Sequence, residues 1–127
     1  MSGNEQDSHA QHNAANLARE ERIKRIAELN DACRQARADH LLTITAGIRE
    51  LGPLAVVSIV QRVRSFDAFT PDNDPYGERD FGAFEHGSDT IFWKIDCYDK
   101  QLEFGSPDPT DPAVTQRVIT IMLASEY

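Results

Sequence analysis

The sequence predicts an α+β fold in two layers, with an antiparallel sheet of three to four strands and about three helices packed on it. Three observations support this class. One early segment repeats apolar residues at helical spacing, a central stretch alternates like two paired strands around a Gly-Ser turn, and the segments follow one another as helix, strand, helix, hairpin, short strand, helix. With 127 residues, of which 40% are apolar, the chain is long enough for one core. We expect a single domain over residues 16–127.

The first fifteen residues differ in composition from the rest of the chain. They are mostly Gly, Asn, Gln, Ser, Asp and His, and offer almost nothing to bury. Ordering such a segment costs conformational entropy that no contact offsets, so residues 1–15 are predicted to be a disordered tail. From Leu17 to Ala36, apolar residues return every three or four positions, which predicts an amphipathic helix.

A strand and a second helix are expected next. Residues 40–46 (HLLTITA) are rich in β-branched residues and suit one strand of a sheet. Pro53 then stands where the first residue of a helix tolerates a missing N–H, and apolar residues follow at helical spacing to about Phe66. Residues 67–77 (DAFTPDNDPYG) are dense in turn formers and predict a loop.

A β-hairpin is the clearest local signal. Residues 79–85 and 89–98 read as two strands joined by a two-residue Gly87-Ser88 turn with positive φ at its first position. This turn fixes a register that places Trp93 over a glycine. The predicted cross-strand pairs are Phe84 with Ile91, Gly82 with Trp93, Phe81 with Lys94, and Arg79 with Asp96.

The C-terminal third is expected to add a short strand and a helix. Residues 101–104 would extend the meander as a third short strand. Asp111 can cap a helix N-terminus and Pro112 suits its first position, so we expect a final helix. Its buried stripe would include Val114, Val118 and Ile121.

Charge and composition narrow the possible partners. The formal net charge is −8, from 21 acidic and 13 basic side chains, which disfavours direct nucleic-acid binding and suits a basic protein partner. No apolar stretch approaches the length of a membrane span, so we expect no membrane partner and a cytoplasmic location. Cys33 and Cys97 lack CxxC spacing and are expected to be reduced and structural. The sequence does not indicate an oligomeric state.

Three long strings occur in order and carry a family resemblance. They are FDAFTPDNDPYGERDFGAFE, IFWKIDCYDKQLEFGSPDPTDPAV and the closing TIMLASEY. Over about residues 26–127 the chain resembles the bacterial family called domain of unknown function 3768. The resemblance implies a bacterial source, often a proteobacterial genome or plasmid, and it implies no activity, ligand or catalytic residue. Cys97 stands where an aromatic residue is common in that pattern, which argues against a thiol role.

The candidate site is an acidic loop followed by one face of the hairpin. We call residues 72–80 the acidic loop; its carboxylates could bind a cation or a basic partner, although Asp and Asn are also ordinary turn residues. A calcium-binding loop starting at Asp72 fails, because Ala83 occupies the position that requires Glu. The candidate binding residues are Asp72, Asn73, Asp74, Tyr76, Glu78 and Asp80 in the loop, with Lys94 and Asp96 on the strand face.

Two functions are compatible with these residues. The first is a non-enzymatic protein-binding or accessory module, for which a plasmid or other mobile element is a compatible setting. The alternative is a small metal-dependent hydrolase or nuclease that uses the acidic loop. No zinc-ligand spacing, P-loop or GxGxxG occurs, so no cofactor and no metal site are predicted, and no catalytic residue is identified.

Overall fold

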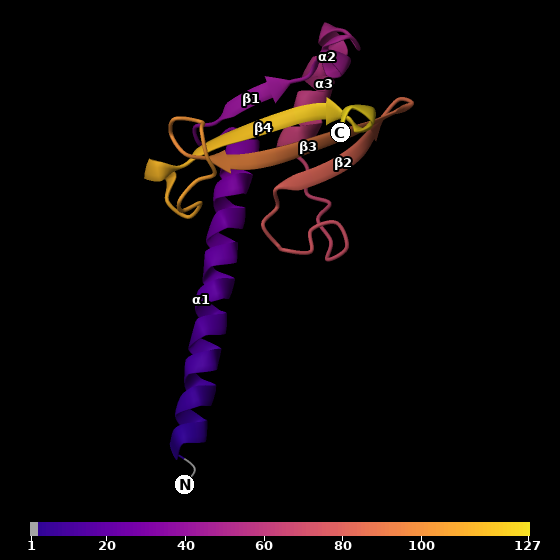
Figure 1. The fold of residues 1–127 in the computed structure, drawn as a ribbon. Helices are drawn as coiled ribbons and strands as arrows, with labels where there is room; N and C mark the ends of the chain where they lie inside the picture. The colour runs from indigo at the N-terminus through magenta and orange to yellow at the C-terminus, as the bar shows by residue number, and fades with distance from the viewer. Residues whose placement is uncertain (1–2) are drawn as a thin grey trace.

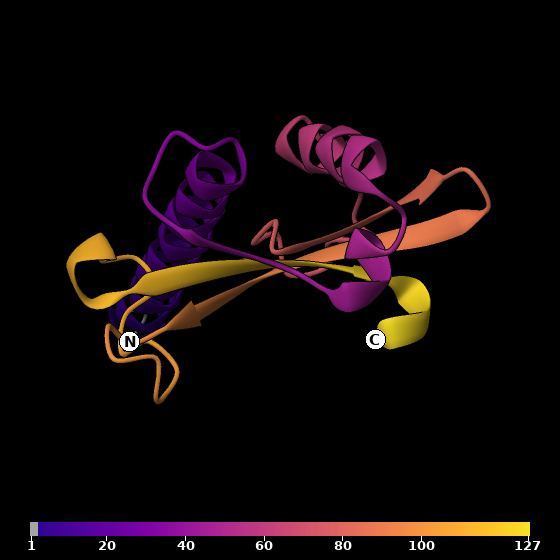
Figure 2. The same cartoon turned by 90° about the horizontal axis from the view of Figure 1, so that it is seen from above.

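A four-stranded sheet with two helices on one face forms the body of the protein (Figures 1 and 2). The structure is a computed structural model that describes residues 3–127. Its elements are α1 (Gly3–Arg34), β1 (Leu41–Ile44), α2 (Ala46–Arg49), α3 (Pro53–Arg64), β2 (Phe81–His86), β3 (Asp89–Tyr98), the 3-10 turn η1 (Pro112–Val114), β4 (Gln116–Leu123) and the 3-10 turn η2 (Ala124–Glu126). Helices α1 and α3 lie on the same face of the sheet, and within residues 3–127 no α-helix packs across the opposite face (Figure 2). The predicted α+β class is confirmed.

The sheet is mixed, not purely antiparallel as predicted. Its strand order is β1-β4-β3-β2, and β1 runs parallel to β4 whereas the other two pairings are antiparallel. The reason is the C-terminal segment, which enters the sheet between β1 and β3. The last strand, β4, is therefore central in the sheet, and β1 and β2 are the two edges.

The final helix is a wrong prediction, because residues 116–123 form strand β4. The local start signal is real: Asp111 Oδ1 accepts a hydrogen bond from Ala113 N at 2.9 Å, and Pro112 opens a helical turn. That turn, η1, lasts only three residues. Residues 118–121 (VITI) are β-branched, and alternate side chains such as Ile119 and Ile121 are fully buried, so packing in the sheet overrides the capping signal.

The hairpin prediction is confirmed in its strands, turn and central register. Gly87 has φ 60° at the first turn position. Phe84 pairs with Ile91, Gly82 with Trp93, and Phe81 with Lys94. The expected strand at residues 101–104 is absent from the described chain; there the backbone turns at Leu102, with φ 60°, and only an isolated bridge joins Tyr98 to Gly105.

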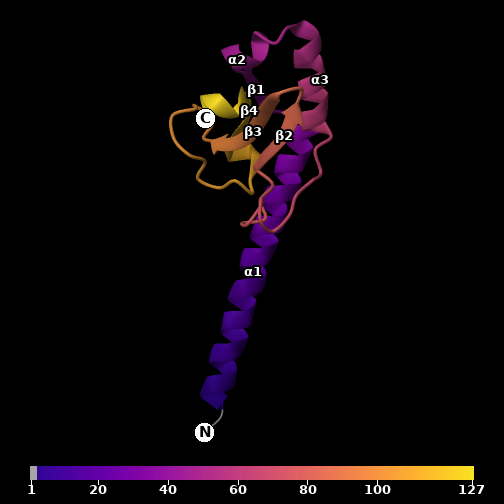
Figure 3. The same ribbon diagram turned by 90° about the vertical axis from the view of Figure 1, so that its right-hand side faces the viewer.

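Helix α1 is longer than predicted. The expected start at Leu17 is wrong, because the helix begins at Gly3, and residues 3–15 of the expected disordered tail are helical in this structure. Residues 1 and 2 lie outside the described residues. Extending an existing helix adds one hydrogen bond per residue, and the segment AQHNAANLA at residues 10–18 supplies four alanines, the best helix former. The N-terminal part of α1 extends away from the sheet (Figure 3).

Trp93 is at the centre of the core between the helices and the sheet. It is fully buried, with Ile91, Ile119 and Ile121 beside it on the sheet and Ile59 and Val63 of α3 across from it. Phe66 and Phe69, at the start of the loop after α3, meet the indole edge-on at centroid distances of 5.5 and 6.1 Å. This contact ties the first part of the long loop to the core.

None of the helices within residues 3–127 is long and apolar enough to cross a bilayer.

Glu126 ties the C-terminal turn to the start of α2, and this gives a first prediction. Its Oε1 accepts hydrogen bonds from Leu123 N at 2.8 Å and Thr45 Oγ1 at 2.7 Å, and Oε2 accepts one from Gly47 N at 3.2 Å. These bonds, that from Leu123 N first, lower the pKa of the carboxyl below its ordinary value of 4.5. Its stabilising effect is therefore complete above pH 4.5 and is lost as the pH falls through the lower folded-state pKa.

We expect Glu126→Gln to lower Tm by a few degrees at pH 7, with the difference from wild type disappearing in acid. Thermal unfolding followed by circular dichroism between pH 7 and pH 2.5 measures this. Glu103→Gln, at an exposed carboxylate, is the matched control and should leave Tm unchanged. An equal Tm difference at both ends of the pH range would refute the role of the ionised carboxylate.

Candidate functional site

The loop between α3 and β2 is closed by its own side chains. Thr70 N donates to Asn73 Oδ1 at 2.7 Å, and Asn73 N donates to Thr70 Oγ1 at 3.2 Å. Asn73 Nδ2 donates to Ala68 O at 2.8 Å. The side chain of Asn73 is therefore occupied in holding the turn, as ordinary turn chemistry predicts.

Asp74 has a similar internal role. Its Oδ1 accepts a hydrogen bond from Arg79 N at 3.1 Å, and its backbone carbonyl accepts one from Gly77 N at 3.1 Å. Arg79 has φ 55°, a left-handed conformation that is uncommon outside glycine. Asp74 thus fixes the turn that leads into β2.

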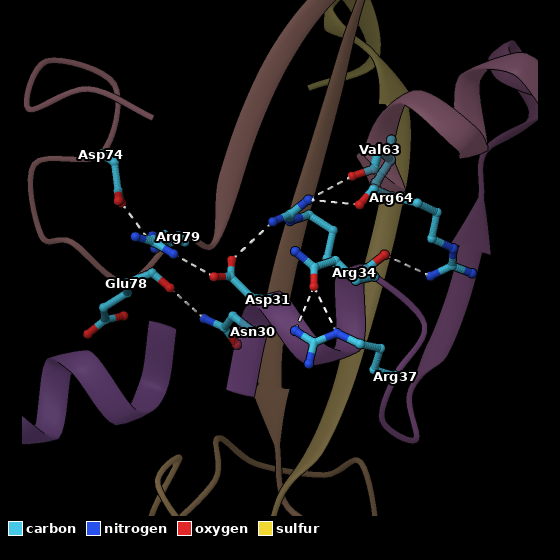
Figure 4. A network of polar contacts seen from close by, with 10 residues as sticks. Asn30, Asp31, Arg34, Arg37, Val63, Arg64, Asp74, Glu78 and Arg79 are labelled. Atoms are coloured by element: carbon cyan, nitrogen blue, oxygen red, sulfur yellow. Dashed lines mark hydrogen bonds and ion pairs between the residues drawn. The ribbon is translucent and has the colours of Figure 1, made fainter. Parts of the chain in front are cut away.

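Arg79 contacts helix α1 and not β3. The predicted pairing of Arg79 with Asp96 is wrong, because the left-handed turn at Arg79 takes the residue out of the strand, which begins at Phe81. Arg79 Nη1 instead pairs with Asp31 Oδ2 at 2.5 Å (Figure 4). Its guanidinium lies over the ring of Phe69, 5.7 Å from the centroid. This contact holds the end of the acidic loop against α1.

Arg34 is the buried counterpart of Arg79. Its Nη2 pairs with Asp31 Oδ1 at 3.0 Å, and its Nη1 donates to Val63 O and Arg64 O at 3.1 and 3.2 Å (Figure 4). These two carbonyls lie at the C-terminal end of α3, where backbone oxygens lack partners within the helix. The guanidinium also lies over the ring of Trp93 at 5.3 Å. Arg34 therefore joins α1, α3 and the sheet.

The sequence interpretation missed this anchor. Arg34 falls within the predicted first helix, and a charged residue there reads as part of a solvated face. Asp31 three residues earlier on the same helix was the available signal, since such a pair lies on one face and can neutralise a buried arginine.

Glu78 and Asp80, at the end of the acidic loop, have fixed backbones but carboxylates without an ion pair in the described chain. Their backbone carbonyls are fixed, because Glu78 O accepts from Asn30 Nδ2 at 2.9 Å and Asp80 O accepts from Ile95 N at 2.8 Å. Within residues 3–127 neither carboxylate forms an ion pair. The backbone is thus rigid, whereas the two charged groups remain available.

The environment of these two carboxyls raises the pKa of both. For Glu78 the larger cause is burial, followed by repulsion from Asp80, which Arg22 partly opposes. For Asp80 the first cause is again burial, with further repulsion from Asp74 and Asp96. Each charge therefore weakens the folded state at neutral pH.

Lys94 and Asp96 lie on the open face of β3 and neutralise each other. Lys94 Nζ and Asp96 Oδ2 are 3.0 Å apart, with side chains 37% and 36% exposed. The hydrogen bond with Asp96 raises the pKa of Lys94. Phe81 is opposite Lys94, as predicted, and it contacts Phe92 edge-on at a centroid distance of 5.1 Å. Aromatic rings therefore flank the ion pair.

The structure divides the eight predicted residues into groups. Asn73 and Asp74 hold the loop, Lys94 and Asp96 form an ion pair on the sheet face, Asp72 and Tyr76 are exposed, and Glu78 and Asp80 carry charge without an ion-pair partner among the described residues. Asp74 and Asp80 help to raise the pKa of Glu78, and Asp74 and Asp96 help to raise that of Asp80, so these four carboxylates lie near one another. In the part of the chain that the structure describes, no three His, Cys, Asp or Glu side chains gather in a way that could hold a metal ion.

Comparison with known protein families now identifies the chain. The model of the family described as "Protein of unknown function (DUF3768)" matches residues 44–126, which is more than half of the sequence. The chain belongs to this family. No curated protein matches the chain, and no solved structure matches it. The DUF3768 region contains the acidic loop and strands β2 to β4, whereas Asp31 and Arg34 of α1 precede it.

Proposed function

We propose that this DUF3768 chain is a non-enzymatic protein-binding module whose acidic loop receives a basic segment of another protein. The observation that carries the proposal is the pair Glu78 and Asp80. Both carboxylates are held on a fixed backbone and close to other negative charges, without an ion pair in the described chain; Glu78 is partly buried and Asp80 is exposed. A lysine or arginine from a partner would relieve that repulsion. The charge arrangement that disfavours the free protein would therefore favour the complex.

Two neighbouring features suit a protein partner better than a small ligand. Tyr76 in the same loop is 80% exposed, and an exposed tyrosine offers a large amphipathic contact at low entropic cost. On the uncovered sheet face, Phe81 and Phe92 cluster with Tyr127 at centroid distances of 6.3 and 5.7 Å. Charge would steer a basic partner to the loop, and the aromatic side chains would add contact area.

The alternative of a metal-dependent hydrolase or nuclease has no geometric support. That chemistry requires several carboxylates converging on one ion. In the acidic loop Asp74 is bonded to backbone, and Asp72 is exposed without contributing to a metal-holding group among the described residues. A bacterial source, with a plasmid or other mobile element as the genetic context, stays a prediction from the resemblance, and a cytoplasmic location stays a prediction from the sequence.

The experiment compares the chain with two triple variants of equal net charge. Asp72→Asn, Glu78→Gln and Asp80→Asn remove the charges of the acidic loop, whereas Glu20→Gln, Glu50→Gln and Glu103→Gln remove three exposed charges elsewhere. Tagged proteins are incubated with bacterial lysate, and retained proteins are quantified by mass spectrometry at low and moderate salt. We expect a basic partner that the loop variant loses and the control variant keeps.

The loop variant should also be more stable than wild type at pH 7, by less than about 1 kcal/mol because solvent screens both groups. Since both pKa values are raised in the fold, this gain should disappear as the pH falls through them and the carboxyls protonate. Equal retention by the two triple variants, or retention by neither wild type nor variants, would reject the binding role. A stabilised loop variant with unchanged binding would separate the electrostatic result from the functional one.

A further inference from the structure

Arg117 is a buried cation without an opposite charge. It lies on β4 with its side chain directed toward α1, and the residue is only 4% exposed. Its Nε donates to Asn30 Oδ1 at 2.7 Å, and its Nη2 donates to Pro109 O at 2.6 Å. Both acceptors are neutral, and no carboxylate within residues 3–127 lies within ion-pair distance of Arg117.

The other buried arginine on this side of the sheet is different. Arg34 is 1% exposed and is paired with Asp31. A guanidinium cannot lose its proton to escape burial, so an arginine inside a protein is normally matched by an anion. Neutral oxygens accept hydrogen bonds from Nε and Nη2 of Arg117 but leave its positive charge uncompensated. An anion beside Arg117 would compensate this charge.

A small cavity adjoins this guanidinium. Its volume is about 100 Å³, and its lining includes Leu29, Cys33, Asp39, Lys100, Thr115 and Arg117. Nη1 of Arg117 has no hydrogen-bond partner in the described chain. This atom is not fully enclosed, so it retains access to solvent. This volume is about that occupied by three water molecules in liquid water, which is enough for a small oxyanion.

The charges around the cavity favour an anion. Lys100 adds a second cation, and Asp39 is the single carboxylate in the lining. The Cys33 thiol supplies no negative charge, because burial raises its pKa and its Sγ donates to Asp39 O at 3.4 Å. The lining thus carries one net positive charge in a protein whose overall charge is −8.

We propose that this cavity binds a small oxyanion of the phosphate or sulfate type, held by Nη1 of Arg117 and the ammonium group of Lys100. The site lies at the end of the sheet where β4 begins, between α1 and the chain that leads from β3 into β4. It uses none of the residues of the acidic loop. Its test is therefore independent of the binding experiment described above.

The experiment titrates the full-length ¹⁵N-labelled protein with sodium phosphate and, separately, with sodium sulfate at pH 7, with sodium chloride keeping the ionic strength constant. The probes are the Arg117 Nε–H and the Asn30 side-chain amide signals. Because Arg117→Gln removes a buried network and could prevent folding, the diagnostic variant is Lys100→Gln at an exposed position. Lys24→Gln, an exposed lysine of α1, is the control with the same charge change.

We expect saturable shifts of both signals with phosphate or sulfate, and affinity about tenfold weaker in Lys100→Gln, the loss expected for one contact between charged groups. Lys24→Gln should bind like wild type. The proposal is overturned if the two signals do not saturate up to tens of millimolar oxyanion, if chloride alone produces the same shifts, or if Lys100→Gln binds as tightly as the control.

Discussion

Replacing Gly82 with alanine should destabilise the protein by about 3 kcal/mol, at the upper end of the cost of overpacking a core. A Cβ at this position would lie 2.3 Å from Nε1 of Trp93 and 2.6 Å from its Cε2. The indole cannot move away, because it is fully buried and held edge-on by Phe66 and Phe69. The strain must pass into β2, which would have to move off the sheet.

Urea and thermal unfolding measure this effect, with Tm falling by roughly 10 °C for a domain of this size. Gly105→Ala is the matched control, because a Cβ there has nothing within 4 Å and Gly105 does not have a positive φ. Replacing glycine at such a position typically stabilises by a few tenths of a kcal/mol or more, through the unfolded chain. Similar stability of the two variants would show that Trp93 does not need the space above Gly82.

The hairpin could be predicted from sequence because its determinants are local. A Gly-Ser turn sets the register, and the alternation on both sides agrees with it, so Trp93 opposite Gly82 follows from neighbours in the chain. Strand β4 could not be predicted in this way. Asp111 and Pro112 form a valid helix start, and the choice of strand depends on β1 and β3, which are distant in sequence. The parallel pairing of β1 with β4 follows from that choice.

In the candidate site, too, the local features could be predicted from sequence and the long-range contacts could not. That residues 72–80 form a loop of turn-forming and acidic residues could be predicted, and so could the position of Lys94 on the strand face. Which carboxylates remain unpaired could not, since this depends on the left-handed turn at Arg79 and on Asp31, a helix residue about fifty positions away. Asn30 fixing the carbonyl of Glu78 is likewise a long-range contact. Sequence composition located the loop, and tertiary contacts decide which of its charges face outward.

Arg34→Met should lower the free energy of unfolding by about 3–5 kcal/mol, the range measured when one partner of a buried ion pair is removed. Methionine keeps most of the apolar volume but leaves Arg64 O without a donor and Val63 O with only the backbone bond from Phe66 N at 3.3 Å. It also removes one of the two arginines that pair with Asp31, whose side chain is only 14% exposed. Loss of this link should loosen α1 from α3, which hydrogen exchange of the last turn of α3 would detect together with the fall in Tm.

Arg79→Met is the matched control, because Arg79 pairs with the same Asp31 and lies over the same Phe69 ring, at 5.7 Å against 5.5 Å for Arg34. Its side chain is 48% exposed, so its ion pair is screened and the loss should stay under about 1 kcal/mol. If both variants lost the same stability, burial would not be what makes Arg34 important, and Asp31 would serve α1 and the acidic loop equally. A large difference would instead mean that the core is anchored through Arg34, and that Arg79 mainly holds the end of the acidic loop against α1.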